Sequence, residues 1–172
     1  DLEATKRTSP TALDLQPRVY LANVHLRAGR RDLWIQELEA LVKDAPTAAT
    51  AIEELAKAYL LEKRYADADR VLTSEINRTG ATPDSRWFFL RGQVSLDLNQ
   101  IDKAFADFRR GAEVGGYTPR GVLQVLGWCV RTGRCAEGVD YFAQYGGAER
   151  ATSAVTAKYG QLLAKSGQKA KA

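Results

Sequence analysis

The sequence predicts an all-α protein, a solenoid of stacked antiparallel helical hairpins. The first observation is a series of small residues separated by 34 or 36 positions: Ala22, Ala56, Gly92 and Gly160, with Leu126 in the corresponding position of the fourth unit. The second is a series of turn positions at the same period: Gly29, Lys63, Asn99, Gly133 and Gly167. No segment alternates apolar and polar residues as a half-buried strand does. A constant period of this size is typical of repeats that each form one supersecondary unit.

A second series of small residues lies twelve positions after the first, at Ala68, Ala104 and Gly138. Trp34 is the exception in the first unit. The axes of two packed helices come closest together only where a side chain between them is very small. We therefore expect the two helices of each hairpin to make their closest contact at these positions.

Hydrophobic periodicity and capping signals predict nine helices, at about 17–28, 31–44, 48–62, 65–78, 84–98, 101–114, 119–131, 135–145 and 151–165. Thr82-Pro83 and Thr118-Pro119 each place a hydroxyl side chain before a proline that suits the first helical position. Pro46-Thr47 is expected to end one helix and cap the next.

The ends of the chain fit the repeat less well. Residues 1–16 are expected to hold only a short helix after Ser9-Pro10, which stops before Pro17, because proline interrupts helical hydrogen bonding. We therefore divide the chain into an extension (1–16), a repeat domain (17–167) and a tail (168–172). The chain begins at Asp1 and contains no Met, which leads us to expect a processed or excised piece.

Composition excludes several classes of protein. With 25 Lys and Arg against 21 Asp and Glu, the net charge is only +4. No basic run is longer than a pair such as Arg30-Arg31 or Arg109-Arg110. Nucleic acid is therefore not an expected partner. No run approaches the roughly 18 to 20 apolar residues of a membrane span, and the longest, 121–130, contains Gln124.

Catalytic chemistry is also not expected. His25 is the only histidine, and with two cysteines it cannot supply the usual four zinc ligands. Gly115-Gly116 and Gly146-Gly147 end helices and do not follow strands, so neither is expected to hold a phosphate. We expect no cofactor, no metal and no enzymatic activity.

The pattern resembles the tetratricopeptide repeat, a helix-turn-helix of 34 residues with the spaced signature W-x2-L-G-x2-Y, A-x3-F, P. The second and third units carry the resemblance, in Leu55, Ala56, Tyr59, Tyr65, Ala68 and Leu72 and in Gly92, Ala104 and Phe108. His25, Trp34 and Leu126 depart from it. The resemblance implies a right-handed solenoid of about four units with a C-terminal capping helix. Sel1-like repeats and generic helical hairpins are the alternatives.

The resemblance implies a non-catalytic scaffold that binds a peptide or a partner protein in a groove formed by the first helices of the units. Carried over position by position, the groove includes Tyr20, Asn23, Arg27, Lys57, Arg86, Phe89, Gln93, Arg120, Gln124 and Arg131, with Leu123 and Val130 beside them. Phe89 could instead pack against the next hairpin, and single arginines are often only solvated. Capture of a chaperone C-terminus is disfavoured, because Val19, Glu54 and Leu90 occupy positions that require charge or amide.

In the geometry that the resemblance implies, Cys129 and Cys135 face the space between the two helices of the fourth hairpin. We expect them to form a disulfide, and therefore an oxidising compartment such as the bacterial periplasm. The alternative is a pair of reduced core thiols in a cytoplasmic protein. The expected setting is bacterial envelope assembly or export. Alternative functions are a polyanion- or polysaccharide-binding module, or the substrate-recruiting part of a larger enzyme or export complex.

Overall fold

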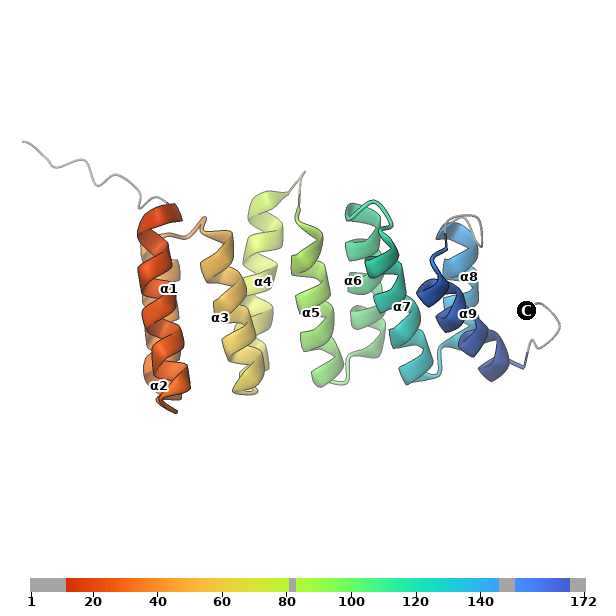
Figure 1. The fold of residues 1–172 in the computed structure, drawn as a ribbon, viewed down its shortest axis with the longest axis horizontal. Helices are drawn as coiled ribbons and strands as arrows, with labels where there is room; N and C mark the ends of the chain where they lie inside the picture. Colours follow the sequence, from red (N-terminus) through yellow and green to blue (C-terminus); the bar gives the residue numbers. More distant parts are fainter. Residues whose placement is uncertain (1–11, 81–82, 146–150, 168–172) are drawn as a thin grey trace, which may run out of the picture. The chain divides into compact units, whose positions relative to one another are not determined.

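A computed structural model describes residues 12–80, 83–145 and 151–167. Regular secondary structure in these residues is α-helical throughout (Figure 1). The helices are α1 (Ala12–Arg27), α2 (Arg31–Asp44), α3 (Ala49–Leu61), α4 (Tyr65–Thr79), α5 (Ser85–Asp97), α6 (Ile101–Val114), α7 (Pro119–Thr132), α8 (Cys135–Tyr145) and α9 (Ser153–Lys165). The chain forms two compact units, Asp1–Leu72 and Thr73–Ala172, which we call unit 1 and unit 2.

The predicted all-α fold of stacked antiparallel hairpins is confirmed, and most helix ends lie within two residues of those expected. In unit 1, α2 packs against both α1 and α3. In unit 2, α6 packs against α5 and α7, and α8 packs against α7 and α9. Within each unit, α2, α6 and α8 therefore each pack against two neighbouring helices.

The expectation that a helix stops before Pro17 is wrong, because α1 runs continuously from Ala12 to Arg27. Pro17 lies near the start of the helix, where the missing amide removes a single hydrogen bond, to the carbonyl four residues earlier. The extra turn also buries Leu15, which packs in a cluster with Leu41, Ala45 and Ala51. Burial of that leucine offsets the cost of the proline.

The capping predictions are confirmed at one junction and wrong at two. Thr118 caps α7, with Oγ1 accepting a hydrogen bond from the Gly121 amide, and Pro119 occupies the first helical position. Helix α5 is capped by the Asp84 carboxylate, which accepts a hydrogen bond from the Arg86 amide, and the expected cap Thr82 lies outside the described residues. Helix α3 follows Ala48, which makes no side-chain capping bond, so Thr47 is not the cap.

The predicted turn positions all adopt the left-handed backbone conformation. The φ angles are +73° at Gly29, +58° at Lys63, +57° at Asn99, +76° at Gly133 and +77° at Gly167. In three of these turns the next amide donates to a carbonyl five residues back, namely Arg30 to His25 at 2.9 Å, Arg64 to Tyr59 at 2.8 Å and Gln100 to Ser95 at 2.7 Å. This is the hydrogen bond of a Schellman turn, which satisfies a carbonyl at the end of the first helix.

The small residues mark close contacts between paired helices, as predicted, except at Gly160. A Cβ atom at Gly92 would lie 2.7 Å from Cε1 of Phe108, and one at Gly138 would lie 2.9 Å from Cβ of Cys129. Ala22, Ala56, Ala68 and Ala104 are fully buried. A Cβ atom at Gly160 would meet nothing within 4 Å, so its lack of a side chain serves no close contact there.

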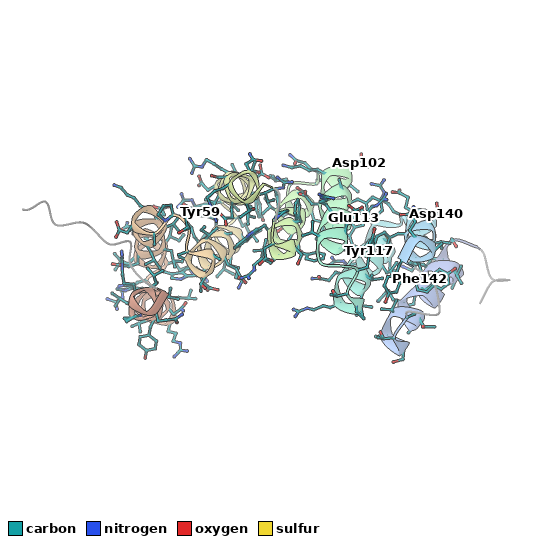
Figure 2. The ribbon with its side chains drawn as sticks, turned by 90° about the horizontal axis from the view of Figure 1, so that it is seen from above. Tyr59, Asp102, Glu113, Tyr117, Asp140 and Phe142 are labelled. Carbon is teal, nitrogen blue, oxygen red and sulfur yellow. The ribbon has the colours of Figure 1, made fainter. Side chains whose placement is uncertain are left out.

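Aromatic side chains dominate the core of unit 2. Phe105 stacks on Trp128 with ring centroids 5.0 Å apart, and Phe142 stacks on Tyr159 at 3.9 Å. Seen from above (Figure 2), α6 and α8 lie in one layer, and α7 and α9 lie in the other. Asp102 and Asp140 lie on the outer side of the first layer, whereas Phe142 lies between the layers.

A buried ion pair connects α5 to α6 within this core. The Arg91 guanidinium donates two hydrogen bonds to the Asp107 carboxylate, at 2.9 and 2.6 Å, and a third to Thr73 Oγ1 at 3.2 Å. The Asp107 side chain is only 6 % exposed, so the paired arginine is needed to compensate its desolvation. The pair fixes how α5 sits against α6.

The expected disulfide is not present, because Cys129 and Cys135 are both free thiols, and both are buried. Cys129 lies over Gly138, three residues farther along α8 than Cys135, where a Cβ atom would come within 2.9 Å of it. Burial raises the pKa of the Cys129 thiol to about 12. The prediction of an oxidising compartment rested on this disulfide, so the free thiols remove its support. The predicted setting in the bacterial envelope stays a prediction.

Gly92→Ala should destabilise the protein by about 1–2 kcal/mol, because the cost of overpacking against Phe108 exceeds the gain in helix propensity. Gly160→Ala is the matched control: it is also a helical glycine but has open space, and should stabilise by about 0.5–1 kcal/mol. Urea denaturation followed by circular dichroism measures both. Two changes of the same sign would contradict the predicted contact.

Lys63→Gly should stabilise the protein by about 0.5–1 kcal/mol, because lysine is strained in the left-handed conformation and glycine is not. The gain is reduced by the larger conformational entropy that glycine gives to the unfolded chain. Asn99→Gly should gain less, since asparagine tolerates this conformation better. The shift of the urea midpoint measures both substitutions. Destabilisation by Lys63→Gly would mean that this turn is not left-handed.

Iodoacetamide at pH 8.5 should leave Cys129 unmodified in the folded protein, because a pKa near 12 lowers the thiolate fraction about a thousandfold and burial blocks access. Mass spectrometry of tryptic peptides measures the modification. After unfolding in urea without reductant, both cysteines should be alkylated. A pair that resists alkylation until reductant is added would demonstrate the disulfide that the structure lacks.

Candidate functional site

A pocket of about 310 Å³ opens on the layer of unit 2 that contains α7 and α9; we call it the α7 pocket. Its lining comes from four helices: Gln93 of α5, Phe108 of α6, Leu123, Gln124, Gly127, Val130 and Arg131 of α7, and Lys158 of α9. Three residues predicted for the groove, Gln93, Gln124 and Arg131, therefore lie together. Leu123 and Val130, expected beside them, lie there too.

The helical period explains how α7 contributes most of the lining. Leu123, Gly127 and Val130 are separated by four and three residues, so they share one face of the helix. The opposite face carries Val122, Val125 and Cys129, which are fully buried in the core. A Cβ atom at Gly127 would meet nothing within 4 Å, so the glycine leaves open space in the middle of the pocket wall.

Phe108 provides the aromatic part of the lining although it belongs to the other layer. Its ring lies against Gly92, which has no side chain to keep it away. It is held between Phe89, at 6.2 Å between ring centroids, and Trp128, at 6.0 Å. The close contact that joins α5 to α6 thus also places a rigid apolar surface in the pocket.

The polar part of the α7 pocket is cationic. Arg131 and Lys158 carry its charges, and no Asp or Glu lines it. Among the described residues, Arg131 makes no ion pair, and the Lys158 ammonium donates at 3.0 Å to the neutral amide oxygen of Gln161. Gln93 Nε2 makes only a long contact, 3.4 Å, with Asp97 Oδ1. These donors are available to a ligand that carries acceptors.

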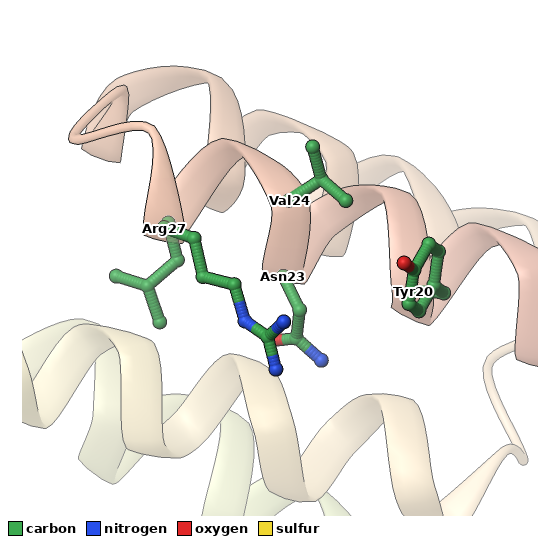
Figure 3. Close-up of a pocket in the computed structure, with 5 residues that line it drawn as sticks. Tyr20, Asn23, Val24 and Arg27 are labelled. Atoms are coloured by element: carbon green, nitrogen blue, oxygen red, sulfur yellow. The ribbon is translucent and has the colours of Figure 1, made fainter.

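A second pocket, of about 300 Å³, lies on α1 in unit 1 and contains three more predicted residues, Tyr20, Asn23 and Arg27, with Val24 and Leu26. Figure 3 shows the Arg27 guanidinium next to the Asn23 amide, on the side of α1 away from Val24. Tyr20 is 67 % exposed. We call this the α1 pocket.

The remaining predicted groove residues line neither pocket. Lys57 is exposed on α3 and pairs with Glu53 at 2.7 Å and Glu54 at 3.1 Å, and the hydrogen bond with Glu53 raises the pKa of Lys57. Arg86 pairs with Asp84 at 2.7 Å. Phe89 is half-buried and packs on Phe108, and Arg120 is exposed on α7.

Sequence reasoning missed a third pocket, on the layer of α6 and α8. It has a volume of about 360 Å³ and is lined by Asp102, Phe105, Ala106, Arg109, Arg110, Glu113 and Arg134. Most of its charges form ion pairs: Arg134 with Asp102 at 2.5 Å and with Glu137, and Arg110 with Glu113 at 3.2 Å. Arg109 instead donates to the neutral amide oxygen of Gln144 at 3.2 Å. The Arg134 guanidinium also stacks over the Phe105 ring, 4.8 Å from its centroid.

Within the described ranges, no three His, Cys, Asp or Glu side chains gather as a metal site would require. His25, which the sequence placed between helices, has a buried Nδ1 atom without a hydrogen-bond partner in this part of the chain. Among the same residues, no helix has both the length and the apolar character of a membrane span.

No protein-family model matches the chain, and no curated protein matches it in sequence. Solved structures do match. The putative kinesin light chain TPR-like repeats of Podosopora anserina superpose with a TM-score of 0.67 at 16 % identity, over 90 % of this chain and 87 % of theirs. YrrB, a TPR protein with an unusual peptide-binding site, gives 0.59 at 18 %, over 90 % and 78 %.

MamA (41-end) from Desulfovibrio magneticus RS-1 gives a TM-score of 0.60 at 16 % identity, over 78 % of this chain and 75 % of that one. These are all helical-repeat proteins, and at such low identity the likeness concerns the fold alone. It agrees with the left-handed turns and small-residue contacts described above. The chain therefore has the fold of the tetratricopeptide-repeat proteins, in which helices pack in successive antiparallel pairs.

Proposed function

We propose that this protein is a non-catalytic interaction module that binds an extended peptide segment of a partner protein in the α7 pocket. The observation that carries the proposal is the composition of this pocket. Apolar surface from Phe108, Leu123 and Val130 lies beside donors from Gln124, Arg131 and Lys158. Specific binding sites in proteins combine these two features, because apolar contact gives affinity and a few placed polar groups give orientation.

The form of the α7 pocket suits a peptide better than a small molecule. Its lining spans three helices of one layer, α5, α7 and α9, so a ligand that crosses them contacts successive repeats. A chain in extended conformation has side chains that alternate in direction, which matches apolar and polar contacts side by side. One structural neighbour, YrrB, is described as having a peptide-binding site, which supports the same use of this fold.

Selection from a displayed random dodecapeptide library on the immobilised protein tests the proposal. The selected peptides should bind the wild type and lose at least tenfold in affinity to Gly127→Leu. The leucine would extend into the pocket from a position where an added Cβ atom has no neighbour within 4 Å. Fluorescence anisotropy of labelled peptides measures the affinity.

Gly160→Leu is the matched control, because Gly160 is also a helical glycine with open space and does not line the α7 pocket. It should bind the selected peptides like the wild type. Failure to select any peptide, or equal affinity of Gly127→Leu and wild type, would contradict the proposal.

A further inference from the structure

We propose that the α7 pocket recognises an acidic peptide, with one or more carboxylates held between Arg131 and Lys158. The inference rests on the proposed function and names the chemistry of the partner. The charges that line this pocket differ from most charges on the rest of the described surface.

Most arginines of the described residues are already neutralised. Arg18 pairs with Asp44 at 2.7 Å, Arg31 with Glu62 at 2.6 Å and Arg64 with Asp67 at 2.8 Å. The same holds in the pocket on the α6 and α8 layer, where Arg134 and Arg110 have carboxylate partners. Arg131 and Lys158 pair with no carboxylate in the described part of the chain. Arg27, Arg30, Arg109 and Arg120 share this property, but Arg131 and Lys158 lie together in one pocket whose lining contains no acidic residue.

The two cations come from different repeats and line the same pocket. Arg131 lies in the last turn of α7, and Lys158 lies in the first half of α9. With no acidic residue in the lining, the pocket carries an uncompensated positive charge beside apolar surface. A carboxylate is the ligand group that satisfies an arginine and a lysine together, through charge-assisted hydrogen bonds.

Apolar neighbours of the two cations strengthen the preference for a carboxylate and add a preference for apolar side chains. Phe108 is 6 % exposed and Val125, behind the pocket wall, is fully buried, so the lining is rigid. Charge attraction is stronger beside such a surface than in bulk water. Leu123 and Val130 offer apolar contact next to the cations. The best ligand therefore carries acidic and apolar side chains close together in sequence.

Charge reversal tests the inference directly. Selection of random dodecapeptides on the wild type should enrich Asp and Glu several-fold over the unselected library. Selection on Arg131→Glu with Lys158→Glu should instead enrich Lys and Arg. Both residues are at the surface, and circular dichroism confirms that the variant is folded. A wild-type pool without acidic enrichment, or an unchanged preference after reversal, would overturn the inference.

The affinity for one selected acidic peptide then measures how much each cation contributes to binding. Arg131→Gln and Lys158→Gln should each weaken it about tenfold or more, as loss of a charge-assisted hydrogen bond does. Arg120→Gln is the control: it removes the same charge from the same helix, outside the pocket. An equal loss in all three variants would mean that only net charge matters, and would overturn the inference.

Two further outcomes separate this inference from the proposed function. Peptides that depend on Gly127 but carry no acidic residues would retain the proposed function and overturn the acidic preference. A heparin oligosaccharide or an oligothymidylate that binds more tightly than any selected peptide at 150 mM salt would assign the pocket to a polyanion and overturn both. Such binding would fall steeply with salt.

Discussion

The structure depends on how each pair of helices closes. A residue in the left-handed conformation ends the first helix, and the chain turns back so that the second helix passes over a small residue of the first. At Gly92 the contact is so close that a single methyl group would collide with Phe108. Loss of this contact would separate α5 from α6 and change every face that the two helices present.

The same contact forms part of the binding surface. Because Gly92 has no side chain, Phe108 of α6 reaches the α7 pocket, where it lies among residues of α5, α7 and α9. A rigid aromatic surface in a pocket costs no ordering when a ligand binds. The packing that stabilises the hairpin and the geometry that would receive a peptide thus have one origin.

Charge is distributed in two ways on this scaffold. Pairs such as Arg110 with Glu113 and Arg70 with Asp67 are exposed and three residues apart on one helix. Such pairs contribute little to stability, but they neutralise the surface on which they lie. The α7 pocket has cations without this neutralisation. Uncompensated charge beside apolar surface is typical of an interaction site, because it favours one class of partner over others.

The period in the sequence predicted most of the fold, and it succeeded where residue type alone would fail. Lys63 and Asn99 are not glycines, and only their register with Gly29 and Gly133 indicates the left-handed turns that the structure has. The period could also have found Lys158, which lies 34 residues after Gln124 and shares its pocket. It was missed because the last helix was interpreted only as a cap.

Other features could not be predicted because they depend on packing. The helix through Pro17 depends on burial of Leu15 against a distant helix. The pairing of Lys57 with two glutamates of its own helix depends on rotamers. The prediction of a disulfide was wrong because a spacing of six residues across a turn does not fix which side chains of α7 and α8 face each other.

A crystal structure of the protein with a selected acidic peptide tests the central claim most directly. The account predicts an extended peptide across α5, α7 and α9, with a carboxylate in contact with Arg131 and Lys158 and an apolar side chain against Phe108. A peptide bound to the layer of α6 and α8, or one whose carboxylates point into solvent, would contradict it.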